Sequence, residues 1–123
     1  MQLRSLSLVG IAVFAVALSA SAHHSHGAYR MTEYTEIEGT VTELYWINPH
    51  AWIYLEVVGE DGQSAIWALE SAGASTLVGG GVNRDDVKVG DTISARCHQL
   101  RDGSDGCLLG FITTADGVEK EWD

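Results

Sequence analysis

Histidine is the residue of this sequence with the clearest potential for chemistry, because a neutral imidazole nitrogen binds transition metals near physiological pH. The chain contains five histidines. Three of them lie close together, at His23, His24 and His26, and the other two are His50 and His98. Short histidine-rich tracts bind metal ions. The tract therefore predicts a metal site that uses His23, His24 and His26.

The residues before this tract have the features of a secretory signal peptide. Arg4 provides a positive start, an apolar run extends from Leu6 to Leu18, and Ala20 and Ala22 fit the small-residue rule for cleavage. The apolar run of roughly 13 residues is shorter than the ~20 needed to cross a bilayer, which argues against a membrane anchor. We therefore expect a cleaved signal peptide and a protein that works in the periplasm.

Cleavage after Ala22 would change what the first histidine can do. The mature chain would begin at His23, and its free α-amine and imidazole together can chelate one metal ion. Sites rich in nitrogen ligands favour Cu(II) over Ni(II) and Zn(II). Cleavage at another position would remove this chelate. The alternative interpretation is a solvated polar leader in which the histidines are incidental.

His50 is a candidate ligand because of its surroundings in the sequence. It lies in the run from Trp46 to Trp52, where an Asn-Pro pair favours a turn. His50 could bind a metal, donate a hydrogen bond or contact a stacked ligand. In the structural alternative, Asn48 and His50 satisfy backbone groups of the turn while the tryptophans pack in the core. His98 could join His50 if the fold brought the two together.

A second candidate site would bind its ligand without a metal. Aromatic side chains before and after the turn could form a surface for a sugar, a small molecule or a protein partner. The members of this alternative site are Trp46, Asn48, His50, Trp52, Tyr54 and Trp67.

Composition and missing motifs restrict the class of function. The chain has 123 residues, with 7 Lys+Arg against 17 Asp+Glu and a net charge of -10. This balance argues against electrostatic binding to nucleic acid or to an anionic membrane surface. The sequence has no nucleophile elbow, phosphate loop, zinc-protease helix motif or dinucleotide fingerprint. We therefore expect a binding protein and not an enzyme.

The two cysteines point to a disulfide. Cys97 and Cys107 flank a turn-forming run from Arg101 to Gly106. Thiol pairs in exported proteins usually oxidise. The spacing is unlike the short Cys-x-x-Cys clip of metal sites. We predict that a disulfide joins Cys97 and Cys107 across a hairpin.

The remaining patterning predicts five strands and one short helix. The expected strands are 34–46, 51–58, 64–70, 92–100 and 107–114, and the expected helix is 74–78. Ser71 or Ser75 is the expected N-cap of this helix. The apolar face of the first strand changes phase after Val41, which indicates a bulge.

This order of elements favours an all-β fold, a small five-stranded Greek-key barrel of the oligonucleotide/oligosaccharide-binding type, over a small open sandwich. We expect a signal peptide at 1–22, a histidine-rich polar leader at 23–32 and a single barrel domain at 33–123.

Several short motifs give the chain a likeness to a known family. They are His23-His24-Ser25, the run from Trp46 to Ile53, Val89-Gly90-Asp91 and Asp102-Gly103-Ser104. The chain resembles a family of uncharacterised exported bacterial proteins, a domain of unknown function. The resemblance implies export in a Gram-negative bacterium and a small β-rich domain, and it implies no activity. The late hairpin of that family usually lacks cysteines, so Cys97, His98 and Cys107 depart from its pattern.

Two functions follow from these residues. In the first, a periplasmic protein binds copper as its only cofactor, with chelation by His23, help from His24 and His26, and a further nitrogen from His50. In the second, the aromatic surface binds a non-metal ligand or a periplasmic protein partner. In both, the mature chain contacts neither nucleic acid nor membrane.

Overall fold

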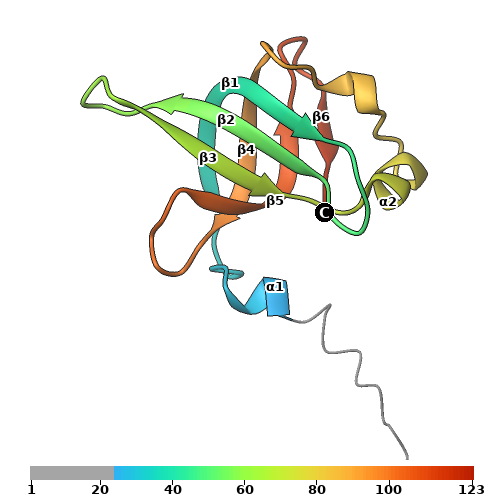
Figure 1. Cartoon of the computed structure of the whole chain (residues 1–123), viewed down its shortest axis with the longest axis horizontal. Helices are drawn as coiled ribbons and strands as arrows, with labels where there is room; N and C mark the ends of the chain where they lie inside the picture. Colours follow the sequence, from blue (N-terminus) through green and yellow to red (C-terminus); the bar gives the residue numbers. More distant parts are fainter. Residues whose placement is uncertain (1–23) are drawn as a thin grey trace, which may run out of the picture.

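The computed structural model describes residues 24–123, which form six strands and three short helices (Figure 1). The strands are β1 (Thr35–Tyr45), β2 (Trp52–Val58), β3 (Ser64–Glu70), β4 (Thr92–Gln99), β5 (Gly106–Thr113) and β6 (Glu119–Glu121). The helices are α1 (His24–Gly27), α2 (Ala74–Gly79) and the 3-10 helix η1 (Arg84–Asp86).

The first five strands close into a mixed barrel. β1 pairs with β2 and β4, β2 pairs with β3, β4 pairs with β5, and β3 runs parallel to β5 to complete the ring. α2 is the short helix between β3 and β4. This confirms the predicted five-stranded barrel. β6 was not predicted, and it extends the sheet beyond β5.

A β-bulge bends the first strand. The register between β1 and β2 shifts between Val41 and Glu43, at the predicted change of apolar phase. Gly39 lets the two strands approach closely, because a Cβ at this position would lie 2.6 Å from the carbonyl oxygen of Glu56. The long strand can therefore belong to both halves of the barrel wall.

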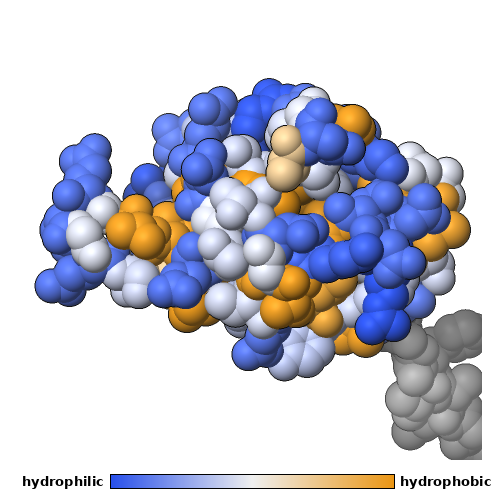
Figure 2. All heavy atoms as spheres, turned by 90° about the horizontal axis from the view of Figure 1, so that it is seen from above, coloured by the Kyte–Doolittle hydropathy of each residue, from blue (hydrophilic) through white to orange (hydrophobic). Residues whose placement is uncertain are grey.

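The core fills the barrel with alternate residues of each strand. Its largest fully buried side chains include Ile53, Leu55, Leu69, Ile93, Leu109, Ile112 and Trp122. Trp122 also ties two segments together, because its N–H donates to Gly110 and its carbonyl accepts from Ala72. On the surface shown in Figure 2, hydrophilic residues separate small apolar patches.

The start of α2 is capped by a side chain from another loop. The N-cap is Gly73, without a side-chain cap of its own, so the prediction of Ser71 or Ser75 was wrong. Asn48 supplies the missing acceptor, since its Oδ1 lies 3.0 Å from the N–H of Ser75. Its Nδ2 also donates to the Ser75 hydroxyl at 3.0 Å. The loop before β2, which includes a cis Asn48-Pro49 peptide, is thus fixed to α2.

The predicted disulfide joins the ends of β4 and β5. Cys97 and Cys107 are bonded, with 5.6 Å between their Cα atoms. The hairpin that they close also receives the leader, because Tyr29 forms a β-bridge with Leu100. The N–H of Arg101 donates to the carbonyl of Ala28 at 2.9 Å.

The leader is therefore part of the fold and not a separate tail. Residues 24–27 form α1, and Tyr29 is 5 % exposed. The predicted signal peptide, residues 1–22, and His23 lie outside the described residues. Within residues 24–123, no helix has the length and apolarity that a membrane crossing requires.

Candidate functional site

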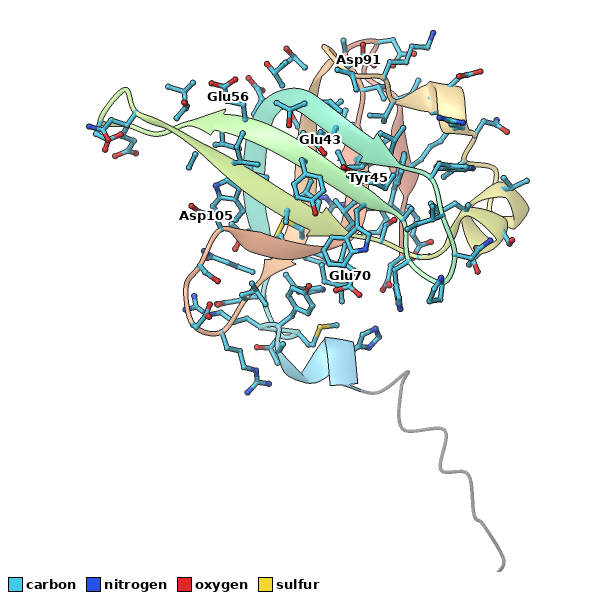
Figure 3. The ribbon with its side chains drawn as sticks, in the orientation of Figure 1. Glu43, Tyr45, Glu56, Glu70, Asp91 and Asp105 are labelled. Carbon is cyan, nitrogen blue, oxygen red and sulfur yellow. A yellow bond between two sulfur atoms is a disulfide. The ribbon has the colours of Figure 1, made fainter. Side chains whose placement is uncertain are left out.

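The centre of the candidate site is a buried carboxylate at the end of β3. Glu70 is 6 % exposed. It is the last residue of β3, beside Trp52 on β2 and Leu108 on β5. In Figure 3 its side chain points away from the barrel toward the segment that follows α1. A charged group in this position needs hydrogen-bond partners, because burial without them is costly.

Tyr29 of the leader is the first of these partners. Its hydroxyl donates to Oε2 of Glu70 at 2.6 Å, a short bond typical of a hydroxyl and a carboxylate. Burial, this hydrogen bond and the negative charge of Glu70 together raise the pKa of Tyr29 far above its ordinary value. The phenol therefore stays protonated and keeps the leader attached to the barrel.

His50 approaches the other oxygen of the same carboxylate. Its Nδ1 lies 3.1 Å from the carbonyl oxygen of Ser71 and 3.4 Å from Oε1 of Glu70. Because a carbonyl oxygen can only accept, Nδ1 carries a proton, and the lone pair of the neutral ring is on Nε2. The side chain is 38 % exposed. A carbonyl or carboxylate that fixes Nδ1–H in this way is the usual support of a histidine that binds a metal through Nε2.

The described part of the leader joins the barrel at the same end as Glu70. The N–H of Tyr29 donates to the carbonyl of His26 at 3.3 Å, so His26 lies one turn of chain from the residue that contacts Glu70. His26 is exposed. His24 begins α1, and His23 lies outside the described residues. The structure thus places His50 beside Glu70, and it places His26 three residues before Tyr29, which contacts the same carboxylate.

Within residues 24–123, no group of three or more His, Cys, Asp or Glu side chains is arranged to hold a metal ion. The described part of the chain therefore contributes His50 without two further ligands beside it. A complete site would need nitrogen ligands from the start of the leader.

His98 occupies a different environment. It is 8 % exposed, and its ring stacks on Tyr34 with 4.4 Å between centroids. Its Nδ1 lies 2.6 Å from the carbonyl oxygen of Glu33 and 3.1 Å from that of Arg30. His98 therefore holds the leader from the β4 side, whereas His50 contacts Glu70 and Ser71.

The site lies within a segment that a family model recognises. The model of a family of unknown function, DUF6152, matches residues 11–109. The chain belongs to this family. The matched segment of this DUF6152 protein includes Tyr29, His50 and Glu70 together with both cysteines. No curated protein and no solved structure matches the chain.

The aromatic residues of the second candidate site divide between the two sides of the barrel wall of this DUF6152 protein. Trp46 and Trp67 pack against the core, and Trp46 meets the edge of Trp122. Trp52 and Tyr54 alternate with the buried Ile53 and Leu55, so they lie on the outside. Asn48 of the same set accepts from a backbone N–H of α2 and not from its own turn, so its role is structural but differs from the one predicted.

Glu70 and Tyr29, which connect His50 to the leader, were not among the predicted site residues. Glu70 gave a weak signal, since it shares a strand face with the apolar Ile66 and Ala68. Tyr29 gave none, because the leader has no periodicity that would predict burial. Their contact spans 41 residues of sequence and depends on the complete barrel.

Proposed function

We propose that this DUF6152 protein is an exported copper-binding protein of the periplasm. The ligands are the α-amine and imidazole of His23, helped by His24 and His26, with a further nitrogen from Nε2 of His50. The role is capture or delivery of the ion, since the sequence carries no signature of redox or hydrolytic machinery.

The shared contact with Glu70 is the observation that carries this proposal. Tyr29 and His50 contact the two oxygens of one carboxylate, at 2.6 Å and 3.4 Å. The leader is therefore anchored beside the ring that would complete its site. His23 precedes the anchored Tyr29 by six residues, so the ligands proposed in the leader lie close to this anchor in the sequence.

The chemistry of these donors fits copper better than other ions. All four histidines offer imidazole nitrogen, and an amine and imidazole on one residue form a chelate. Nitrogen donors in a tetragonal arrangement suit Cu(II), which also binds most tightly among the divalent first-row metals.

Two further features support export. The first 22 residues have the pattern of a signal peptide. The Cys97–Cys107 disulfide is of the kind that persists in oxidising compartments. Such a compartment is also where a free amine at His23 would be generated by cleavage.

A copper titration tests the proposal. Mature protein beginning at His23 is compared with protein that carries one extra glycine before His23 and with His50→Gln, using a competing chromophoric chelator. We expect one tightly bound Cu(II), with affinity lower by about tenfold or more in each variant, the cost typical of perturbing a metal site.

The controls separate a built site from incidental binding. The change Gln63→Ala replaces an exposed residue of the turn between β2 and β3, which lies apart from α1 in Figure 1, and circular dichroism verifies that the variant is folded. Affinity should be unchanged in this variant. If the His50→Gln variant binds copper as tightly as the unchanged mature protein, His50 is not a ligand and the leader alone binds the ion.

A further inference from the structure

The outer face of the sheet formed by β1, β2 and β3 carries carboxylates without any basic side chain. These three strands contain five glutamates and neither lysine nor arginine. Side chains of strands alternate between the two faces of the barrel wall. Because Ile53 and Leu55 point into the core, Trp52, Tyr54 and Glu56 point outward.

The bulge in β1 adds two residues to this outer face. After the register shift, Glu43 lies opposite Tyr54, and Tyr45 lies opposite Trp52. Figure 3 shows Glu43, Tyr45 and Glu56 spread over the side of the sheet turned to the viewer. We call Glu43, Tyr45, Trp52, Tyr54 and Glu56 the acidic aromatic face.

The aromatic rings of this face are arranged as a group. Tyr45 meets Tyr54 edge to face, with 5.9 Å between ring centroids. The hydroxyl of Tyr45 donates to Oε2 of Glu43 at 2.5 Å, which holds a carboxylate beside the rings. Tyr45 is 48 % exposed, and Ile66, the register partner of Glu56, is 52 % exposed. A partner can therefore contact rings and carboxylate together.

Three cations of residues 24–123 are engaged elsewhere in the fold. Arg96 pairs with Glu119, with 3.0 Å between their charged atoms, and stacks over Phe111. Lys120 pairs with Asp86 at 2.7 Å. Arg101 donates from Nε to the carbonyl of Tyr29. Because β1, β2 and β3 themselves contain no lysine or arginine, the positive charge that complements the acidic aromatic face is expected from another molecule.

We propose that the acidic aromatic face binds an extended, lysine- or arginine-bearing segment of a partner protein. Cationic side chains are attracted both to tyrosine and tryptophan rings and to adjacent carboxylates. The outside of a sheet is open and shallow, a shape that suits a chain laid across it, whereas small ligands prefer concave pockets.

The acidic aromatic face lies next to the candidate metal site, but the proposed binding of a basic segment does not depend on a bound metal. Trp52 is the register partner of Glu70, and Glu70 contacts His50. A partner bound to the face would lie beside that end of the barrel. The interaction with a basic segment requires no copper, so it is tested on metal-free protein and stands or falls separately from copper binding.

Binding of a defined peptide tests the proposal. Isotope-labelled, metal-free protein is titrated with an acetylated peptide of alternating lysine and threonine, and with a matched peptide in which serine replaces lysine. We expect amide shifts that cluster on Tyr45, Trp52 and Tyr54 with the lysine peptide alone. Removal of one ring by Tyr45→Ala should weaken binding about two- to fivefold.

Charge variants separate the face from the general acidity of the protein. The pair Glu43→Gln and Glu56→Gln should weaken binding and reduce its salt dependence. The pair Asp85→Asn and Glu121→Gln makes the same change in net charge on other exposed elements and should leave binding unchanged. Equal loss in both pairs would show that only net charge matters, which overturns the proposal.

Other occupants give different results, each of which also overturns it. Spermidine that binds as tightly as the peptide and causes the same shifts would make the face a polyamine site. Self-association in sedimentation that Tyr45→Ala abolishes would make it an interface between two copies of this chain.

Discussion

The hydroxyl of Tyr29 and the carboxylate of Glu70 form a 2.6 Å hydrogen bond across 41 residues of sequence. The bond joins the leader to the end of β3, and it does so at the carboxylate that also faces His50. Folding of the barrel therefore decides where the histidines of the leader are held. The stability of the leader and the geometry of the candidate site are parts of one arrangement.

Replacing Tyr29 by phenylalanine should weaken this arrangement. The variant leaves Oε2 of the buried Glu70 without its donor, which costs about 1–3 kcal/mol of unfolding free energy. Urea denaturation measures the loss, and limited proteolysis should show faster cleavage in the leader.

The exposed Tyr45–Glu43 pair provides a matched control, because it has the same chemistry on the surface. Tyr45→Phe should change the unfolding free energy by about 0.5 kcal/mol or less. Equal effects in the two variants would mean that burial of Glu70 does not strengthen its bond with Tyr29.

Gly73 should resist substitution because the loop before β2 packs directly on it. A Cβ at Gly73 would lie 2.5 Å from the carbonyl oxygen of Pro49 and 2.6 Å from Oδ1 of Asn48. Gly73→Ala should therefore destabilise the protein by about 1–3 kcal/mol, the usual cost of overpacking. Thermal unfolding monitored by circular dichroism would measure it.

Gly79 in the same helix is the control for this change. Nothing lies within 4 Å of a Cβ built there. Gly79→Ala should be neutral or stabilise the protein by up to about 1 kcal/mol, since alanine favours helix. A loss from Gly79→Ala as large as that from Gly73→Ala would contradict the proposed contact with the loop.

The disulfide should support both the hairpin and the leader. Cys97 and Cys107 are 10 residues apart, and closing a loop of that size stabilises a fold by about 2–3 kcal/mol. Reduction of the natural protein should lower its urea midpoint accordingly. Hydrogen exchange at Arg30 and Arg101, whose amides join the leader to this hairpin, should become faster on reduction. Unchanged exchange at these amides would show that the disulfide does not stabilise the attachment of the leader.

Asp86 should make the free energy of unfolding fall as the pH is lowered into the acid range. Hydrogen bonds from Lys120 and from the backbone of Asn83 lower the pKa of Asp86 below its ordinary value of 3.8. As the pH falls, the unfolded chain binds the proton first, so this stabilisation is complete above about pH 5 and declines toward pH 3. The difference in urea midpoint between the natural protein and Asp86→Asn should shrink over this range.

The variant Lys120→Met tests the cause of that dependence. It removes the ammonium that donates to Asp86 at 2.7 Å. If Lys120 is the source, Asp86→Asn in the Lys120→Met background should show a much smaller pH-dependent difference. An unaltered difference would assign the effect to the backbone of Asn83.

The barrel could be predicted because the patterns that indicate its strands and turns involve residues close together in the sequence. Ile53 and Leu55 alternate with polar or aromatic neighbours, and the change of phase after Val41 marks the bulge. The two cysteines flank a strong turn signal, and this position was enough to predict the disulfide between them. Each of these features depends on residues that are neighbours in the chain or lie across one hairpin.

The organisation of the site could not be predicted because it depends on contacts between distant segments. Asn48 caps α2 from another loop, so neither serine near the helix was needed. Tyr29 becomes buried through its bridge to Leu100 and its bond with Glu70, although the leader is polar. β6 pairs its charged residues with β5 from a tail whose composition indicates no strand.

The most direct test of the account is the pattern of paramagnetic broadening when one equivalent of Cu(II) is added to isotope-labelled mature protein that begins at His23. We expect amide resonances to broaden at the leader and also at His50, Glu70 and Ser71, because the leader and His50 would share the ion. Broadening confined to residues before Ala28, with the resonances around His50 unchanged, would contradict the account.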